Sequence, residues 1–177
     1  MQMTLSNLDA VQLRAWHQSL TAQLGPMVAS FEAIHGYPPG DNEITLAGPG
    51  HRMAARELSG HSAVPPSLVA FYSVIGDVSL GDVGNGYFIH SPENVLEELT
   101  REGPAYSSIS CDQVAVVFAS DGGGSLFAID RQGVVCKSQG ASRDVDFVPA
   151  AQDLVTFLDL LSRSVTDFIA TGQAGHA

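Results

Sequence analysis

The stretch QVAVVFASDGGGSLFAIDRQGVVCKS, residues 113–138, decides the fold of this protein. Residues 113–120 are β-branched and almost wholly apolar, which is typical of a central strand. The turn sequence at 121–124 follows, and two further short strands are expected at 125–130 and 134–138 with a turn between them. Because strands joined by short turns pair antiparallel, the stretch predicts an antiparallel meander.

Segments with helical periodicity surround this meander. Apolar residues recur at three- and four-residue spacing over 5–24, 51–60, 65–75, 92–102 and 150–171. Gly25-Pro26 is expected to end the first helix, and a short strand is expected at 87–90. Helices, then strands, then a helix predict an α+β fold, in which an antiparallel sheet of mixed strand length is covered by helices.

The length of 177 residues favours one main domain. Weak signals between Met27 and Pro49 divide the chain into an N-terminal helical extension (1–47), a main domain (48–172) and a frayed tail (173–177). Trp16 is expected to pack the extension onto the main domain. The core of that domain is expected to include Phe118, Phe127, Phe157 and Phe168.

The charge balance restricts the possible partners. Eight Lys and Arg residues against 19 Asp and Glu residues give a formal charge of −11, which disfavours direct binding to nucleic acid or to anionic membranes. A partner selected by electrostatics would be cationic, whereas the plainer alternative is that the charge only keeps the protein soluble. No secretory signal and no membrane-spanning run is evident, so we expect a cytoplasmic protein in which Cys111 and Cys136 are free core thiols.

The sequence offers no local signature of catalysis or of cofactor binding. No HExxH or GxSxG motif occurs, and the glycine-rich stretches at 81–86 and 121–124 read as turns because no P-loop Lys or following helix accompanies them. We therefore expect a protein that is not an enzyme and that holds no cofactor or metal. The alternative is an enzyme or small-ligand site that uses these turns with Asp77 or Asp121.

One charge pattern points to a binding surface. Between residues 77 and 102 the only basic side chain among six carboxylates is Arg101; the six, which are the candidate partner-binding residues, are Asp77, Asp82, Glu93, Glu97, Glu98 and Glu102. Glu93 and Glu97 repel each other across one helical turn, and a cationic partner would relieve that repulsion. The alternative is an ordinary solvated helix surface in which Glu93 interacts with the positive end of the helix dipole.

Three segments together resemble the SMI1/KNR4 group of the SUKH superfamily. They are HRMAARELSGHSAVPPSLVAFYSVIGD (51–77), VVFASDGGGSLFAIDRQGVV (116–135) and AQDLVTFLDLLSRSV (151–165). The resemblance covers residues 48–171 and implies a non-enzymatic α+β domain. It further implies a bacterial immunity protein that binds and neutralises a cognate toxin, often a nuclease. The alternative within the same family is a regulatory or scaffolding domain that binds an endogenous cytoplasmic protein.

Overall fold

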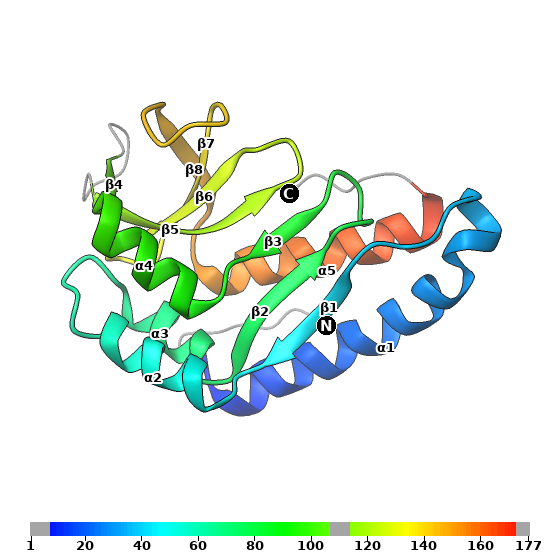
Figure 1. The fold of residues 1–177 in the computed structure, drawn as a ribbon, viewed down its shortest axis with the longest axis horizontal. Coiled ribbons are helices and arrows are strands. Elements are labelled where there is room, and N and C mark those ends of the chain that lie inside the picture. The colour runs from blue at the N-terminus through cyan, green and yellow to red at the C-terminus, as the bar shows by residue number, and fades with distance from the viewer. Residues whose placement is uncertain (1–7, 107–113, 173–177) are drawn as a thin grey trace.

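A computed structural model describes residues 8–106 and 114–172 (Figure 1). These residues form five helices: α1 (Ala10–His35), α2 (Pro49–Leu58), α3 (Pro66–Tyr72), α4 (Pro92–Glu102) and α5 (Leu154–Thr171). They also form eight strands: β1 (Asn42–Leu46), β2 (Ile75–Leu80), β3 (Tyr87–Ile89), β4 (Ala105–Tyr106), β5 (Val114–Asp121), β6 (Leu126–Asp130), β7 (Val135–Ser138) and β8 (Phe147–Ala151).

All eight strands belong to one sheet, and every pairing in it is antiparallel. Seven strands follow the order β1-β2-β3-β5-β6-β7-β8, and the short β4 pairs with β5. The predicted α+β fold with an antiparallel sheet covered by helices is therefore confirmed.

The predicted meander corresponds to β5, β6 and β7 within a residue or two at each end. Two aspartates shape its turns: the carboxylates of Asp121 and Asp130 each accept two backbone N–H bonds of 2.9–3.0 Å from their own turn. A Cβ atom at Gly122 would lie 1.8 Å from the backbone oxygen of Asn85, so only glycine fits there. Both glycine-rich stretches lie in turns between strands, as predicted.

The helices divide into two groups around the sheet. Figure 1 shows α1 and α5 side by side along one face, where α1 also contacts β1 and α5 contacts β8. The short helices α2, α3 and α4 gather at one end of the sheet, where α2 packs against both α3 and α4. Because α2 and α4 meet side by side, the side chains between them face each other at the surface.

The prediction that Gly25-Pro26 ends the first helix is wrong. Helix α1 continues to His35 and is capped by Gly36, whose φ of 82° is left-handed. Buried side chains continue along the same face beyond the proline: Leu24, Met27 and Phe31. Packing of this face outweighs the hydrogen bond that Pro26 cannot donate. Gly25 also lacks the Cβ atom that the proline ring would crowd.

Four of the strands were not predicted: β1, β2, β4 and β8. The helix expected over 65–75 ends at Tyr72, and Ile75 instead begins β2. The closing helix, expected from residue 150, begins at Leu154 because 147–151 pair with β7. Pro149 makes the sequence at 147–151 a weak strand signal, but proline is tolerated there because β8 is an edge strand.

The N-terminal helix and the following strand contribute to the same core as the rest of the chain. Trp16 is 6% exposed, and its indole N–H donates to the Ser162 hydroxyl of α5 at 2.9 Å. Its ring also meets Phe71 edge-on at 6.4 Å. Strand β1 extends the sheet by pairing with β2. Trp16 therefore holds α1 to the main body, as expected.

The expected aromatic core is confirmed, since the rings predicted for it are all buried: Phe118, Phe127, Phe157 and Phe168. Cys136 is buried and free, and burial raises the pKa of its thiol. Cys111 and the tail at 173–177 lie outside the described residues. Among the helices in the described part of the chain, none combines the length and the apolar character needed to cross a membrane.

Candidate functional site

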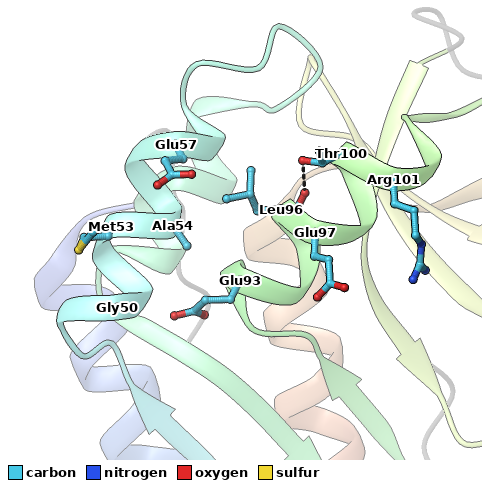
Figure 2. Close-up of a pocket in the computed structure, with 9 residues that line it drawn as sticks. All are labelled: Gly50, Met53, Ala54, Glu57, Glu93, Leu96, Glu97, Thr100 and Arg101. Atoms are coloured by element: carbon cyan, nitrogen blue, oxygen red, sulfur yellow. Dashed lines mark hydrogen bonds between the residues drawn. The ribbon is translucent and has the colours of Figure 1, made fainter.

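A groove of about 550 Å³ lies along the surface where α2 meets α4 (Figure 2). Its α2 wall consists of Gly50, Met53, Ala54 and Glu57, and its α4 wall consists of Glu93, Leu96, Glu97, Thr100 and Arg101. On each helix these residues recur at three- and four-residue spacing over two turns, so each wall is one continuous helix face.

Local sequence signals fix both walls. Pro49 occupies the first turn of α2, and Pro92 occupies the first turn of α4, where Ser91 caps the helix by accepting the Asn94 N–H. The faces opposite the groove carry buried side chains, among them Ala55 of α2 and Val95 of α4. Burial of these faces leaves the groove-lining faces turned towards each other.

The groove has an apolar floor and an acidic rim. Ala54 and Leu96 form this floor, since Ala54 is 6% exposed and Leu96 is half-buried against the core, whereas Met53 is 62% exposed at the outer edge of α2 (Figure 2). Three carboxylates from both walls surround this floor: Glu57, Glu93 and Glu97 (Figure 2). Within 8–106 and 114–172, neither Glu57 nor Glu97 has an ion-pair partner. Their charges therefore face solvent without an ion-pair partner among the described residues.

Arg101, the cationic residue among those that line the groove, does not neutralise its rim. The Arg101 Nε atom lies 3.0 Å from a carboxylate oxygen of Glu102, and Figure 2 shows its guanidinium group directed away from α2. Both side chains are largely exposed, so the pair is weak. The aliphatic part of Arg101 lines the groove while its charge lies outside.

His51 and Glu93 join the two helices at one end of the groove. The backbone N–H of Gly48 donates to Nδ1 of His51 at 3.0 Å, so a neutral His51 ring carries its proton on Nε2. That nitrogen lies 3.8 Å from a carboxylate oxygen of Glu93. Glu93 also lies against the other wall, since a Cβ atom at Gly50 would be 3.2 Å from it. This carboxylate therefore closes one end of the groove.

The six carboxylates predicted as one partner-binding block do not form one surface. Glu93 and Glu97 line the groove, whereas Asp77 lies half-buried in β2. Burial raises the pKa of the Tyr72 hydroxyl, and the charges of Asp77 and Glu93 raise it further.

The Asp82 carboxylate accepts hydrogen bonds from the Gly40 N–H at 2.7 Å and from Asn42 Nδ2 at 2.6 Å. Asp82 therefore holds the segment that leads into β1.

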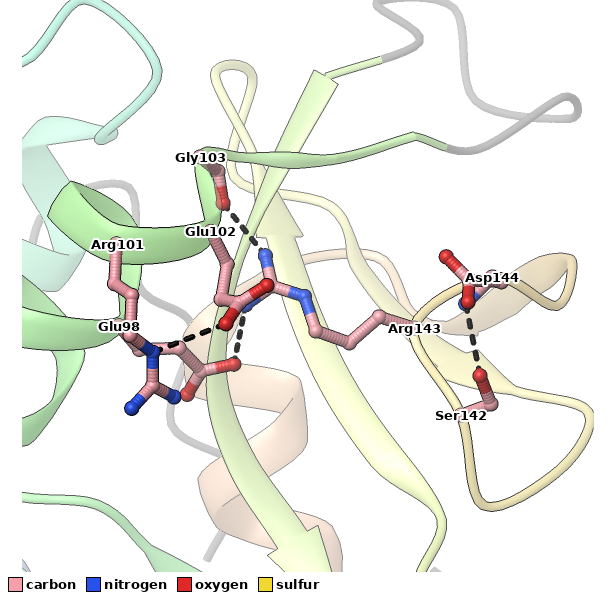
Figure 3. Close-up of polar contacts among 7 residues, drawn as sticks. All are labelled: Glu98, Arg101, Glu102, Gly103, Ser142, Arg143 and Asp144. Atoms are coloured by element: carbon pink, nitrogen blue, oxygen red, sulfur yellow. Dashed lines mark hydrogen bonds and ion pairs between the residues drawn. The ribbon is translucent and has the colours of Figure 1, made fainter.

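Glu98 and Glu102 lie on the other side of α4 (Figure 3). Arg143, from the loop between β7 and β8, reaches the Glu98 carboxylate at 2.5 Å and donates to the Gly103 carbonyl at 2.6 Å. Glu98 thereby anchors that loop to the end of α4. These residues border a polar cleft of about 650 Å³ in which cationic and anionic side chains alternate. Its charges are mixed, in contrast to the rim of the α2–α4 groove.

Sequence reasoning missed Glu57 and Met53 of the α2 wall. Glu57 is 36 positions before Glu93 in the chain, and nothing local indicates that α2 packs against α4. A usable signal existed in α2 itself, where Gly50, Met53 and Glu57 share one helix face.

Asp121, one of the two residues of the alternative site, has structural partners, and the structure adds one further pair of side chains capable of acid–base chemistry, His90 and Ser120. Besides its turn bonds, Asp121 lies 3.2 Å from the Lys137 ammonium. Nε2 of His90 lies 2.9 Å from the Ser120 hydroxyl, and burial lowers the pKa of this histidine. The charge of Glu98 opposes this effect on the His90 pKa. The Glu98 carboxylate, however, accepts a hydrogen bond from Arg143, so it does not orient the His90 ring as the acid of a catalytic triad would. Among the described residues, no cluster of three metal-ligating side chains occurs.

No protein-family model matches this chain, and a search of curated proteins likewise finds no match. The chemistry of the α2–α4 groove is therefore the basis for assigning a function.

Proposed function

We propose that this protein is a non-enzymatic binding domain of the SMI1/KNR4 type that neutralises a cognate basic toxin by stoichiometric binding in the bacterial cytoplasm. The observation that carries the proposal is the α2–α4 groove, in which Glu57, Glu93 and Glu97 surround an apolar floor. A nuclease is the favoured class of toxin.

The rim supplies long-range attraction. Glu93 and Glu97 are one helical turn apart and exposed, so they repel each other, and an approaching cation relieves that repulsion. The formal charge of −11 adds attraction at distances beyond direct contact. A basic partner is therefore drawn to the groove faster than a neutral one.

The floor supplies short-range contact. A Lys or Arg side chain has an aliphatic stem and a charged end, so its stem can cover Ala54 and Leu96 while its cation meets the rim. Exposed apolar surface bordered by charge is characteristic of protein-binding sites.

A nuclease fits this chemistry because nucleases that hold nucleic acid by its phosphates carry clustered Lys and Arg. An acidic protein seated on that cluster occludes the substrate. The resemblance of 48–171 to SMI1/KNR4 domains, among which bacterial immunity proteins occur, favours neutralisation over other uses of an acidic surface.

The test uses a matched pair of triple variants. Tagged wild-type protein captures its partner from native cells at low and moderate salt, beside Glu57→Gln/Glu93→Gln/Glu97→Gln. The control, Glu32→Gln/Glu43→Gln/Asp167→Asn, removes three exposed carboxylates outside the groove. The identified partner is then purified, its association rate is measured with all three proteins, and its toxicity is scored on co-expression.

We expect about tenfold slower association for the groove variant at low salt, with the difference shrinking as salt rises, and little change for the control. Co-expression of the wild type should suppress the toxicity of the partner. Equal effects of the two triple variants would refute the role of the groove. A harmless endogenous partner would instead assign the protein to the regulatory class.

A further inference from the structure

We infer that the occupant of the α2–α4 groove is an amphipathic α-helix of the partner, with an apolar stripe flanked by Lys or Arg. The inference rests on the proposed function and specifies the segment that the groove recognises.

The length of the walls matches two turns of a helix. The α2 wall extends from Gly50 to Glu57 and the α4 wall from Glu93 to Arg101. At about 1.5 Å per residue, each wall is roughly 10–12 Å long, which is two helical turns. Apolar side chains at three- and four-residue spacing on a third helix could lie along the groove where α2 meets α4.

The backbone of the walls also favours a helix over an extended segment. Both walls are helices, whose interior N–H and C=O groups already bond within the helix, so the groove offers side chains and only the few backbone groups of the end turns, such as the Gly50 N–H. An extended segment on this floor would bury N–H and C=O groups without partners. A helix satisfies its own backbone groups and can therefore lie on an apolar floor.

A small residue on α2 permits close approach beyond the end that Glu93 closes. Ala54 is buried with only a methyl group, whereas Leu96 projects from the opposite wall. This combination leaves room for a large apolar side chain of the occupant beside Leu96. The carboxylates on both walls then require positive charge on both flanks of the occupant, which is the charge pattern that we infer.

The probe is a synthetic helical peptide with leucines at positions i, i+3, i+4 and i+7 and lysines on both flanks. One comparison peptide has two central residues replaced by proline, and another has glutamate in place of every lysine. Binding to the full chain is measured by fluorescence anisotropy. We expect the lysine helix to bind in about the micromolar range, the proline peptide at least about tenfold more weakly, and the glutamate peptide not at all.

A matched pair of variants locates the binding. Met53→Lys places a cation at the α2 edge of the groove, and Ile34→Lys makes the same kind of change at a residue that is 70% exposed near the end of α1. Figure 1 shows the end of α1 on the opposite side of the molecule from α2 and α4. We expect Met53→Lys to weaken binding of the lysine helix at least about tenfold and Ile34→Lys to leave it unchanged.

The outcomes separate this inference from the proposed function. Equal affinities for the helical and proline peptides, or no binding of the lysine helix, would overturn the helical occupant. If the purified partner still associated more slowly with the groove triple variant than with the wild type, the proposed function would stand without the helical occupant. If that partner were also indifferent to the groove carboxylates, both would fail.

Discussion

Replacing Phe157 by alanine tests how α5 is fixed to the sheet. The side chain is 2% exposed, and its ring lies 5.5 Å from that of Phe118 on β5 and 5.1 Å from that of Phe127 on β6. Truncating a buried phenylalanine to alanine costs about 3–5 kcal/mol. Each aromatic pair contributes about 0.5–1.5 kcal/mol beyond burial, and two rings held on paired strands cannot readily close the cavity. We therefore expect a loss of about 4–5 kcal/mol.

Urea unfolding followed by circular dichroism measures this loss. The matched control is Ile169→Ala on the same helix, since Ile169 is 46% exposed and its truncation should cost less than about 1 kcal/mol. The dependence of the unfolding free energy on urea should be the same in both variants, because the area exposed on unfolding is nearly unchanged. Fluorescence of the single tryptophan, Trp16, gives a second reading of the same transition.

A loss below about 1 kcal/mol for Phe157→Ala, or one equal to that of Ile169→Ala, would refute the placement of this face of α5 against β5 and β6.

Two further predictions concern pH and the carboxylates. Burial lowers the pKa of His90 below its ordinary value of about 6.5, an effect larger than the opposing influence of Glu98, so the unfolded chain binds this proton more tightly than the folded one. The free energy of unfolding should therefore fall as the pH decreases through about 6.5, and it should fall less in His90→Gln than in the wild type. Parallel pH profiles of the unfolding free energy in the two proteins would contradict this. Asp82→Ala should cost about 1–3 kcal/mol of stability by removing two hydrogen bonds, while leaving the partner's association rate unchanged. Glu97→Gln should instead slow association of the partner and leave stability unchanged. Slower association of Asp82→Ala would show that the Asp82 carboxylate contributes to binding.

Local patterns allowed the meander and α4 to be predicted. The β5–β7 region combines β-branched strands with turn residues, and α4 combines a capping serine with an apolar face, so each signal lies within one short segment. Strand β2 lacked such a signal because Gly76 and Asp77 are poor strand formers. Its pairing with β1 on one side and β3 on the other stabilises it, and that information lies elsewhere in the chain.

The end of α1 was mispredicted for a related reason. Gly25-Pro26 is a strong local helix terminator, but Met27 and Phe31 continue the buried face of the helix. Burying each such side chain contributes about 1.5–3 kcal/mol, which together exceeds the cost of about 3 kcal/mol for a proline in a helix interior. Local propensity therefore loses to packing at this position.

Only part of the candidate site could be predicted, because a count of acidic residues does not show which carboxylates lack a partner within the folded protein. Glu93 and Glu97 could be found from one helix, but counting acids along the chain also included Asp82 and Glu98, whose carboxylates are held by donors within the protein. A carboxylate held by an internal cation such as Arg143 attracts an outside cation less than an unpaired one does, since its field is partly cancelled at short range. Glu57 came from a helix that meets α4 only in the fold. The carboxylates available to a cationic partner are therefore fewer than the sequence indicated, and three of them gather at the α2–α4 groove, where both walls face one apolar floor.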